Sequence, residues 1–155
     1  MKRFASITAL IGVALAVALA VGAWGKGQGP HKARGHSLTV IEHPTTDVTT
    51  DTGAAGDSAG DLLTFANDVF DASDTQKAGT DQGYCIRIVP ATSYECTWTT
   101  SLPKGQITVE GPFYDAKDST LAITGGTGRY RHVRGTMDLN SVGDGKFQFV
   151  FHLIS

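Results

Sequence analysis

From residue 37 to the C-terminus, short stretches of alternating apolar and polar residues are separated by glycine, proline, aspartate and serine. A period of two is typical of a β-strand with one buried face, and these stretches are rich in the β-branched and aromatic residues that strands favour. Eight stretches follow one another: residues 37–43, 61–71, 82–89, 93–100, 105–114, 119–126, 129–139 and 146–155. The pattern predicts an all-β domain at residues 38–155, either an up-and-down barrel or a sandwich. Closure into a barrel would remove exposed strand edges.

The N-terminal segment has a different pattern. Lys2 and Arg3 precede a continuous apolar run that ends in small residues suited to signal cleavage. We interpret residues 1–22 as a secretory signal peptide and residues 23–37, which are glycine-rich without apolar periodicity, as a flexible tether. The alternative is an uncleaved membrane anchor, because residues 4–24 are just long enough to span a bilayer. We therefore expect a secreted protein with no stable membrane insertion after signal cleavage.

The net charge of the chain indicates whether it would attract nucleic acid. Without the signal peptide the chain has 11 Lys and Arg against 15 Asp and Glu, a net charge of −4. An acidic chain has no overall attraction for nucleic acid, so we expect no nucleic-acid partner.

Two sets of residues contain possible metal ligands, but neither set predicts a metal site. The histidines at 31, 36 and 43 match no compact metal site, and the aspartates at 47, 51 and 57 lack the spacing and final glutamate of a helix-flanked calcium loop. Residues 44–60, rich in threonine, aspartate and glycine, have too little apolar area for a strand and are predicted to form a solvated loop.

If the protein is exported, its two cysteines are candidates for a disulfide, because thiols outside the cytosol are usually oxidised. If the stretches on either side of Pro90 form a hairpin, pairing Val89 with Thr92 also places Cys85 opposite Cys96. Opposed residues are close enough for a cross-strand disulfide, which in a short loop would stabilise the fold modestly. The same register puts three more side chains on the face of the cysteines, a mixed face suited to a barrel interior: Arg87, Tyr94 and Trp98.

The glycine-rich stretch LAITGGTGRYRHVRG, residues 121–135, could suggest a phosphate-binding loop. Such a loop needs a helix after its glycines, whereas the residues that follow here are β-branched and aromatic. We predict instead a tight turn at GGTG, residues 125–128, between two strands, with the second strand starting at Arg129 and its basic run facing solvent.

The pattern DSTLAITGGTGRY at residues 118–130, followed by Arg134 and Gly135, resembles the signature shared by allene oxide cyclases and plant dirigent proteins. GDLLTFANDVFD, GYCIR and GQITVEGPFYDAKDSTLAITGGTG are similar to segments of allene oxide cyclases in the same order, so the resemblance covers roughly residues 38–155. It implies an eight-stranded antiparallel barrel, calycin-like in class, with an elongated apolar cavity. It also implies no metal or organic cofactor, and often a homotrimer.

The resemblance implies a function as well. Allene oxide cyclases convert an unstable fatty-acid epoxide to a cyclopentenone by holding it in one folded shape, and dirigent proteins steer the coupling or ring closure of reactive intermediates. In both, confinement does most of the work. We therefore expect a secreted barrel that binds a small hydrophobic or phenolic molecule and directs its cyclisation or stereochemistry, as a cofactor-independent isomerase.

Individual positions carry the family pattern. Glu42 in VIEH matches the cavity glutamate, and Asn67 in FAND matches a polar cavity residue that holds water, so both are expected catalytic residues. Two positions depart from the pattern: Pro44 stands where the plant enzymes have asparagine, and Phe113 stands where they have a tyrosine hydroxyl. These two departures weaken the prediction that the substrate is an epoxide. Four side chains are expected to contact the ligand: Phe65, Cys85, Trp98 and Phe113.

Other interpretations stay open at this stage. A glutamate on a first strand is usually solvated, and an inward asparagine can be a single polar residue bonded to backbone. The protein could be a lipocalin-like carrier of a hydrophobic ligand, or a structural module whose barrel is filled by its own side chains. A Ser-His-Asp hydrolase is not supported, because the chain has no GxSxG motif.

Overall fold

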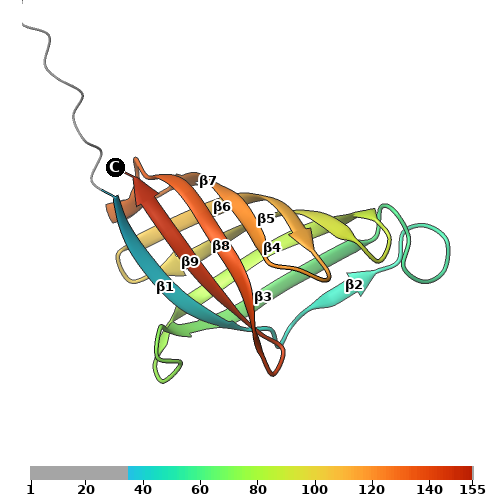
Figure 1. The fold of residues 1–155 in the computed structure, drawn as a ribbon, viewed down its shortest axis with the longest axis horizontal. Helices are drawn as coiled ribbons and strands as arrows, with labels where there is room; N and C mark the ends of the chain where they lie inside the picture. The colour runs from blue at the N-terminus through green and yellow to red at the C-terminus, as the bar shows by residue number, and fades with distance from the viewer. Residues whose placement is uncertain (1–34, 155) are drawn as a thin grey trace, which may run out of the picture. The chain divides into compact units, whose positions relative to one another are not determined.

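The structure, a computed structural model, describes residues 35–154 as a closed antiparallel β-barrel (Figure 1). The barrel strands follow one another around the cylinder in chain order, and β1 pairs with both β9 and β3 to close it. The eight-stranded antiparallel barrel predicted from the sequence is confirmed. The strands are β1 (Gly35–His43), β2 (Val48–Thr50), β3 (Leu62–Asp71), β4 (Lys77–Val89), β5 (Ser93–Leu102), β6 (Gly105–Tyr114), β7 (Ser119–Gly126), β8 (Arg134–Gly143) and β9 (Lys146–Ile154).

The short strand β2 corrects the prediction that residues 44–60 form only a loop. β1 pairs with the second half of β3, residues 68–71, and β2 pairs with its first half, residues 62–64. β1 and β2 therefore lie along the same edge of β3, interrupted between Pro44 and Asp47. The three residues of β2 are exposed, so backbone pairing with an available strand edge forms this element without apolar burial.

The predicted strand at residues 129–139 starts later than expected. Gly128–Tyr130 form a short 3₁₀-helix, and β8 begins at Arg134. Gly128 has φ +57°, and the amide of Arg129 donates to the carbonyl of Lys104, so this segment is held against the β5–β6 turn before β8 begins. The glycine-rich segment still connects two adjacent antiparallel strands, β7 and β8, and the basic side chains after it are exposed.

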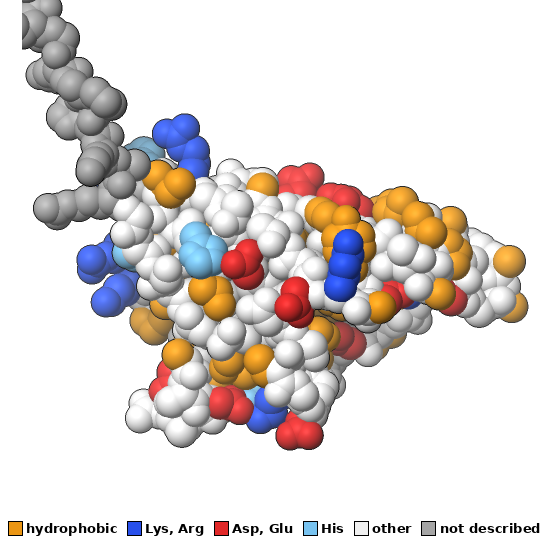
Figure 2. Space-filling model, in the orientation of Figure 1, with side chains coloured by type: hydrophobic (Ala, Val, Ile, Leu, Met, Phe, Trp, Pro, Cys, Tyr) orange, Lys and Arg blue, Asp and Glu red, His pale blue; other side chains and the backbone are white. Residues whose placement is uncertain are grey.

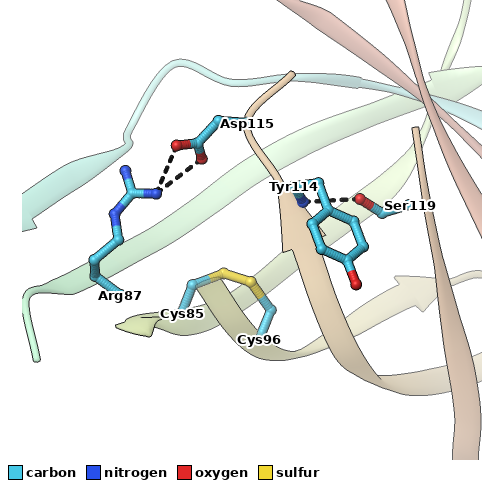
Figure 3. Close-up of a disulfide and its surroundings, with 6 residues drawn as sticks. All are labelled: Cys85, Arg87, Cys96, Tyr114, Asp115 and Ser119. Carbon is cyan, nitrogen blue, oxygen red and sulfur yellow. Dashed lines mark hydrogen bonds and ion pairs between the residues drawn. A yellow bond between two sulfur atoms is a disulfide. The ribbon is translucent and has the colours of Figure 1, made fainter. Parts of the chain in front are cut away.

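The β4–β5 hairpin has the predicted cysteine register. Cys85 pairs with Cys96, and a disulfide joins them with a Cα–Cα distance of 4.0 Å (Figure 3). Nearer the turn the register differs, because a bulge after Arg87 pairs Val89 with Ser93 instead of Thr92. The predicted interior face is confirmed: its cysteines, arginine, tyrosine and tryptophan are all buried.

Arg87 is held inside this face by ion pairs. It donates from Nη1 to both carboxylate oxygens of Asp115, at 2.9 and 2.7 Å, and Figure 3 shows this pair beside the disulfide. Its Nε lies 2.7 Å from Asp57 Oδ1, and its guanidinium lies 3.6 Å from the ring centre of Tyr94. Arg87 is therefore neutralised by carboxylates from the β2–β3 and β6–β7 loops.

The two ends of the barrel differ. At the end where β1 and β8 begin, His36, Arg129, Arg131 and His132 border a surface depression, and Figure 2 shows Lys and Arg gathered at the left-hand end of the molecule. At the other end, where β1 stops and β3 and β9 start, lies the pocket described below.

The predicted signal peptide, residues 1–22, and most of the predicted tether, residues 23–37, lie outside the described residues. The last three residues of that tether, 35–37, are part of β1, so the barrel begins slightly before residue 38. Between residues 35 and 154 no helix is long and apolar enough to cross a membrane.

Candidate functional site

A pocket opens at the end of the barrel opposite His36, Arg129, Arg131 and His132. Its cavity volume is about 50 Å³. Phe65, Phe113 and Phe147 are partly exposed, whereas Trp98 and Phe149 are buried, so the pocket runs from a mouth to a closed floor. Its lining comprises Glu42, Asp47, Leu63, Phe65, Cys85, Cys96, Trp98, Phe113, Leu139, Phe147 and Phe149.

Five of the eleven lining residues are aromatic. The ring of Trp98 lies edge-on to Phe65, with 6.1 Å between ring centres, and 5.5 Å from Phe149. Gly83 makes this arrangement possible, because it is the cross-strand partner of both Phe65 and Trp98 and carries no side chain between their rings. A Cβ at Gly83 would lie 2.3 Å from the Cβ of Trp98. The sequence therefore leaves space in β4 where two aromatic side chains meet.

The polar part of the pocket is organised by Asn67. Its Oδ1 accepts hydrogen bonds from the amides of Thr45 and Thr46 and from the Thr46 hydroxyl, each at 3.0 Å. Its Nδ2 donates to Glu42 Oε1 at 2.9 Å and to Asp47 Oδ1 at 2.8 Å. A flipped amide would set its NH₂ against three donors, so this network defines its orientation. Asn67 thus connects the segment between β1 and β2 to strand β3, and it orients the carboxylate of Glu42.

Glu42 is 6% exposed and lies on the pocket wall. Burial raises the pKa of its carboxyl above the usual value, and the hydrogen bond from Asn67 opposes that rise. Asp81, 1% exposed, sits beside it on β4. Burial and the neighbouring Glu42 raise the pKa of Asp81 to about 9. The site therefore holds two carboxyl groups that cannot easily both ionise.

The predicted site residues are partly brought together. Glu42, Phe65, Cys85, Trp98 and Phe113 all line the same pocket. Cys85 does so as half of a disulfide, so it offers the pocket no thiol. The amide of Asn67 is fully bonded to protein groups and stands behind Glu42.

Sequence reasoning missed Asp81 and the polar row it belongs to. In the strand register Asp81 lies opposite Asn67 on one side and Thr100 on the other, and all three are buried. Among the described residues, both Asp81 oxygens, Thr100 Oγ1 and Trp98 Nε1 are buried without a hydrogen-bond partner in the protein. The signal was present, because Asp81 is four residues before Cys85 and so has its inward parity. No three His, Cys, Asp or Glu side chains within residues 35–154 are arranged to hold a metal ion.

Solved structures share this fold. A pyocyanin demethylase is 24% identical, with a TM-score of 0.65, over 75% of this chain and 100% of that one. An exo-specific intermolecular Diels-Alderase, AbnU, is 15% identical with a TM-score of 0.64, covering 79% and 99% of the two chains. The pterocarpan synthase dirigent protein PsPTS1 is 17% identical with a TM-score of 0.61, covering 78% and 94%. A family model described as the allene oxide cyclase barrel-like domain matches residues 42–150. The chain belongs to the allene oxide cyclase-like barrel family.

Proposed function

We propose that this barrel binds a small hydrophobic or phenolic molecule in its pocket and directs the molecule's cyclisation or stereochemistry, an isomerase-type activity. The observation that carries the proposal is a buried carboxyl group, Glu42, in the wall of a pocket lined mainly by apolar side chains. A buried ionisable group lowers stability relative to an apolar residue at the same position. Its presence in the wall of a pocket therefore favours a functional role for Glu42. The structural neighbours named as a Diels-Alderase and a dirigent protein support a barrel that shapes ring closure or stereochemistry.

The pocket supplies the two contributions that such a reaction needs. The rings of Phe65, Trp98 and Phe149 would restrict an unsaturated ligand to one folded shape, which lowers the entropic part of the barrier. Glu42 would face positive charge that develops on the ligand, and the apolar surroundings would strengthen that attraction. Asn67, expected to be a catalytic residue, would act here by holding Glu42 in place. The unpaired Nε1 of Trp98 is a donor suited to a ligand oxygen.

The size of the pocket restricts the ligand. Pockets for drug-sized ligands usually measure about 300–1,000 Å³. The cavity volume of about 50 Å³ is well below that range, so a guest would be small or would lie partly in the mouth. Phe113 and Phe147, in edge-to-face contact with ring centres 5.9 Å apart, are partly exposed, and their rotation would widen the entrance.

The proposal is tested by native mass spectrometry of protein purified from its source, followed by extraction of any bound molecule. A cyclised molecule that the protein also forms from its open precursor supports the proposal. Glu42→Gln should then reduce turnover at least tenfold while retaining binding, whereas Glu110→Gln, on an exposed position of β6, should not change the rate. Equal rates for the Glu42→Gln variant and the unaltered protein would remove the catalytic role of Glu42.

The alternative function is a lipocalin-like carrier that shelters a hydrophobic ligand without changing it. The largely apolar wall favours it, because such a wall binds apolar molecules whether or not chemistry follows. Extraction of an unaltered ligand that remains unaltered on prolonged incubation would support the carrier. An empty barrel that takes up no apolar probe, even with Phe113→Ala opening the mouth, would instead favour a structural module.

We also propose that the protein is exported. The cross-strand disulfide between Cys85 and Cys96 supports this, since such bonds persist mainly outside the reducing cytosol. N-terminal sequencing of the protein recovered from the culture medium should start near residue 23. Recovery only from the membrane with an intact N-terminus would support the uncleaved anchor.

Self-association through the outer face of β4 is proposed as the basis of a homotrimer. Tyr84, Ile86 and Ile88 alternate along this strand with their side chains outward and are 47%, 40% and 53% exposed. A row of apolar side chains on a sheet exterior favours contact with another copy. Ile86→Lys should reduce the mass measured by light scattering to that of a monomer, while Ile154→Lys, at an exposed apolar position of β9, should not. A monomeric unaltered protein would refute the trimer.

A further inference from the structure

The polar row beside the pocket contains two buried carboxyl groups, Glu42 and Asp81, and the proposed function uses only one of them. The β3–β4 register places Asp81 opposite Asn67, and the β1–β3 register places Glu42 opposite Val69, two residues along from Asn67 on the same face. β3 therefore lies between the strands that carry Glu42 and Asp81, and these two side chains, far apart in sequence, interact across it. Both side chains are buried.

No cation neutralises this pair among the described residues. Glu42 accepts one hydrogen bond, from Asn67 Nδ2, and neither Asp81 oxygen accepts any. The nearest further charge is a third carboxylate, Asp47, which accepts the other proton of Asn67 Nδ2. A hydrogen bond between two carboxyl groups requires a proton on one of them, because ionised carboxylates are acceptors only.

The charged groups on the surrounding strands are engaged elsewhere. On β1, His43 pairs with Asp74, and on β3, Asp68 pairs with Lys77. On β5, the neighbouring side chain is the neutral hydroxyl of Thr100, the cross-strand partner of Asp81. Two buried like charges that interact, with no cation beside them, cannot both persist.

We propose that Glu42 and Asp81 share one proton at neutral pH, and that the pair serves as the acid of the pocket, with Glu42 presenting the proton and Asp81 acting through it as a positioning residue. The shared proton rests on the burial of both side chains, on the strand register and on the unpaired oxygens of Asp81; its use in catalysis rests on the proposed function. The direction of the pKa shifts agrees with a shared proton. Burial raises the pKa of both carboxyl groups, and the neighbouring Glu42 raises that of Asp81 further. Two coupled carboxyls of this kind titrate as a pair.

The shared proton points to a class of ligand: an unsaturated apolar molecule bearing a proton-accepting oxygen, such as a carbonyl or ether oxygen. The pair would give its proton to that oxygen, leaving both carboxylates ionised beside the positive charge on the ligand carbon skeleton. When the new ring bond forms, the oxygen would release the proton back to the pair. The proton is recovered and no electron is gained or lost, so the step is an isomerisation that needs no co-reactant.

The first test follows the proton without any ligand. NMR of side-chain carboxyl carbons, labelled in Asp and Glu, should show one buried carboxyl that remains protonated at pH 7 and titrates near pH 9. Asp81→Asn should remove that titration and move the Glu42 titration to lower pH, because the new amide can donate to Glu42. Glu42→Gln should lower the titration of Asp81, which loses its charged neighbour. Titration of both groups below about pH 5, independently of each other, would overturn the shared proton.

Circular dichroism separates these results from misfolding, and Asp118→Asn, an exposed carboxyl variant, provides the matched control. The second test uses the substrate recovered by extraction. Turnover by the unaltered protein should fall about tenfold per pH unit above pH 9, and in Asp81→Asn this fall should begin at lower pH. An unshifted pH profile in that variant would refute the catalytic use while leaving the shared proton intact. A confirmed shared proton in a barrel that binds no ligand would refute only the proposed function.

Discussion

Asn67→Ala is the substitution for which the structure makes the sharpest prediction. Asn67 is 1% exposed and makes five hydrogen bonds, three accepted and two donated. It joins the chain between β1 and β2 to β3, and alanine removes all five bonds at once. If Asn67 served only to hold a ligand, this change would leave stability nearly unaltered.

The magnitude follows from where each partner lies. A hydrogen bond contributes about 1 kcal/mol net, so five bonds give an upper figure of about 5 kcal/mol. Thr45, Thr46 and Asp47 are exposed, and water can replace part of what they lose. Glu42 is buried and loses its donor outright, which costs about 1–3 kcal/mol. We expect Asn67→Ala to lower the free energy of unfolding by about 3 kcal/mol.

The loss should also depend on pH. The bond from Asn67 lowers the pKa of Glu42, so removing it raises the folded-state pKa further above the unfolded value. A raised carboxyl pKa contributes stability at low pH that is lost as pH rises. The deficit of Asn67→Ala relative to the unaltered protein should therefore be smallest in acid and should grow as pH rises through the range in which Glu42 titrates.

Urea denaturation followed by tryptophan fluorescence at several pH values measures both effects. Asn140→Ala is the matched control, because Asn140 also lies on a barrel strand but makes one side-chain bond of 3.4 Å, to Gln148. It should cost less than about 0.5 kcal/mol. An Asn67→Ala variant within 1 kcal/mol of the unaltered protein, at every pH, would refute the structural role assigned to this side chain.

Three further predictions concern the barrel interior. Replacing Cys85 and Cys96 together by serine should lower the free energy of unfolding by about 3 kcal/mol, the chain-entropy figure for a loop of this length, with the oxidised and reduced unaltered protein as reference. Gly83→Ala should destabilise by about 1–3 kcal/mol, because the added Cβ meets Trp98 and the adjacent backbone, and thermal unfolding measures this. Asp81→Asn should gain stability relative to the unaltered protein as pH rises from about 4 to 9, by at most about 1.4 kcal/mol per pH unit, because the Glu42–Asp81 pair keeps a proton in the folded state that it loses on unfolding.

Each of these predictions has a contrary outcome. Identical denaturation midpoints for the oxidised and reduced protein would exclude a stabilising disulfide. Gly125→Ala introduces a methyl group that meets no atom within 4 Å, so an equal effect at Gly125 and Gly83 would mean that crowding is not the cause. A difference between Asp81→Asn and the unaltered protein that stays constant with pH would show that Asp81 titrates alike in the folded and unfolded chain.

Local sequence determined the strands and their buried faces. Alternation with a period of two predicts which side chains share a face. The Cys85–Cys96 register predicted from the hairpin was correct, although a bulge next to the turn pairs Val89 with Ser93. The same alternation predicted that Trp98 and Arg87 face inward. The family motifs between Asp118 and Gly135 pointed to closure into a barrel, which strand patterns alone left open against a sandwich.

Tertiary structure decided what the pattern could not express. Val48–Thr50 form a strand because β3 has a free edge beside them, and residues 128–130 form a 3₁₀-helix held by a hydrogen bond from Arg129 to Lys104 in the β5–β6 turn. Above all, Glu42 and Asp81 interact only because β1 closes the cylinder against β3. Strand alternation is a property of neighbouring residues, whereas contact between distant strands, and the charge it buries, depends on how the whole sheet curves and closes.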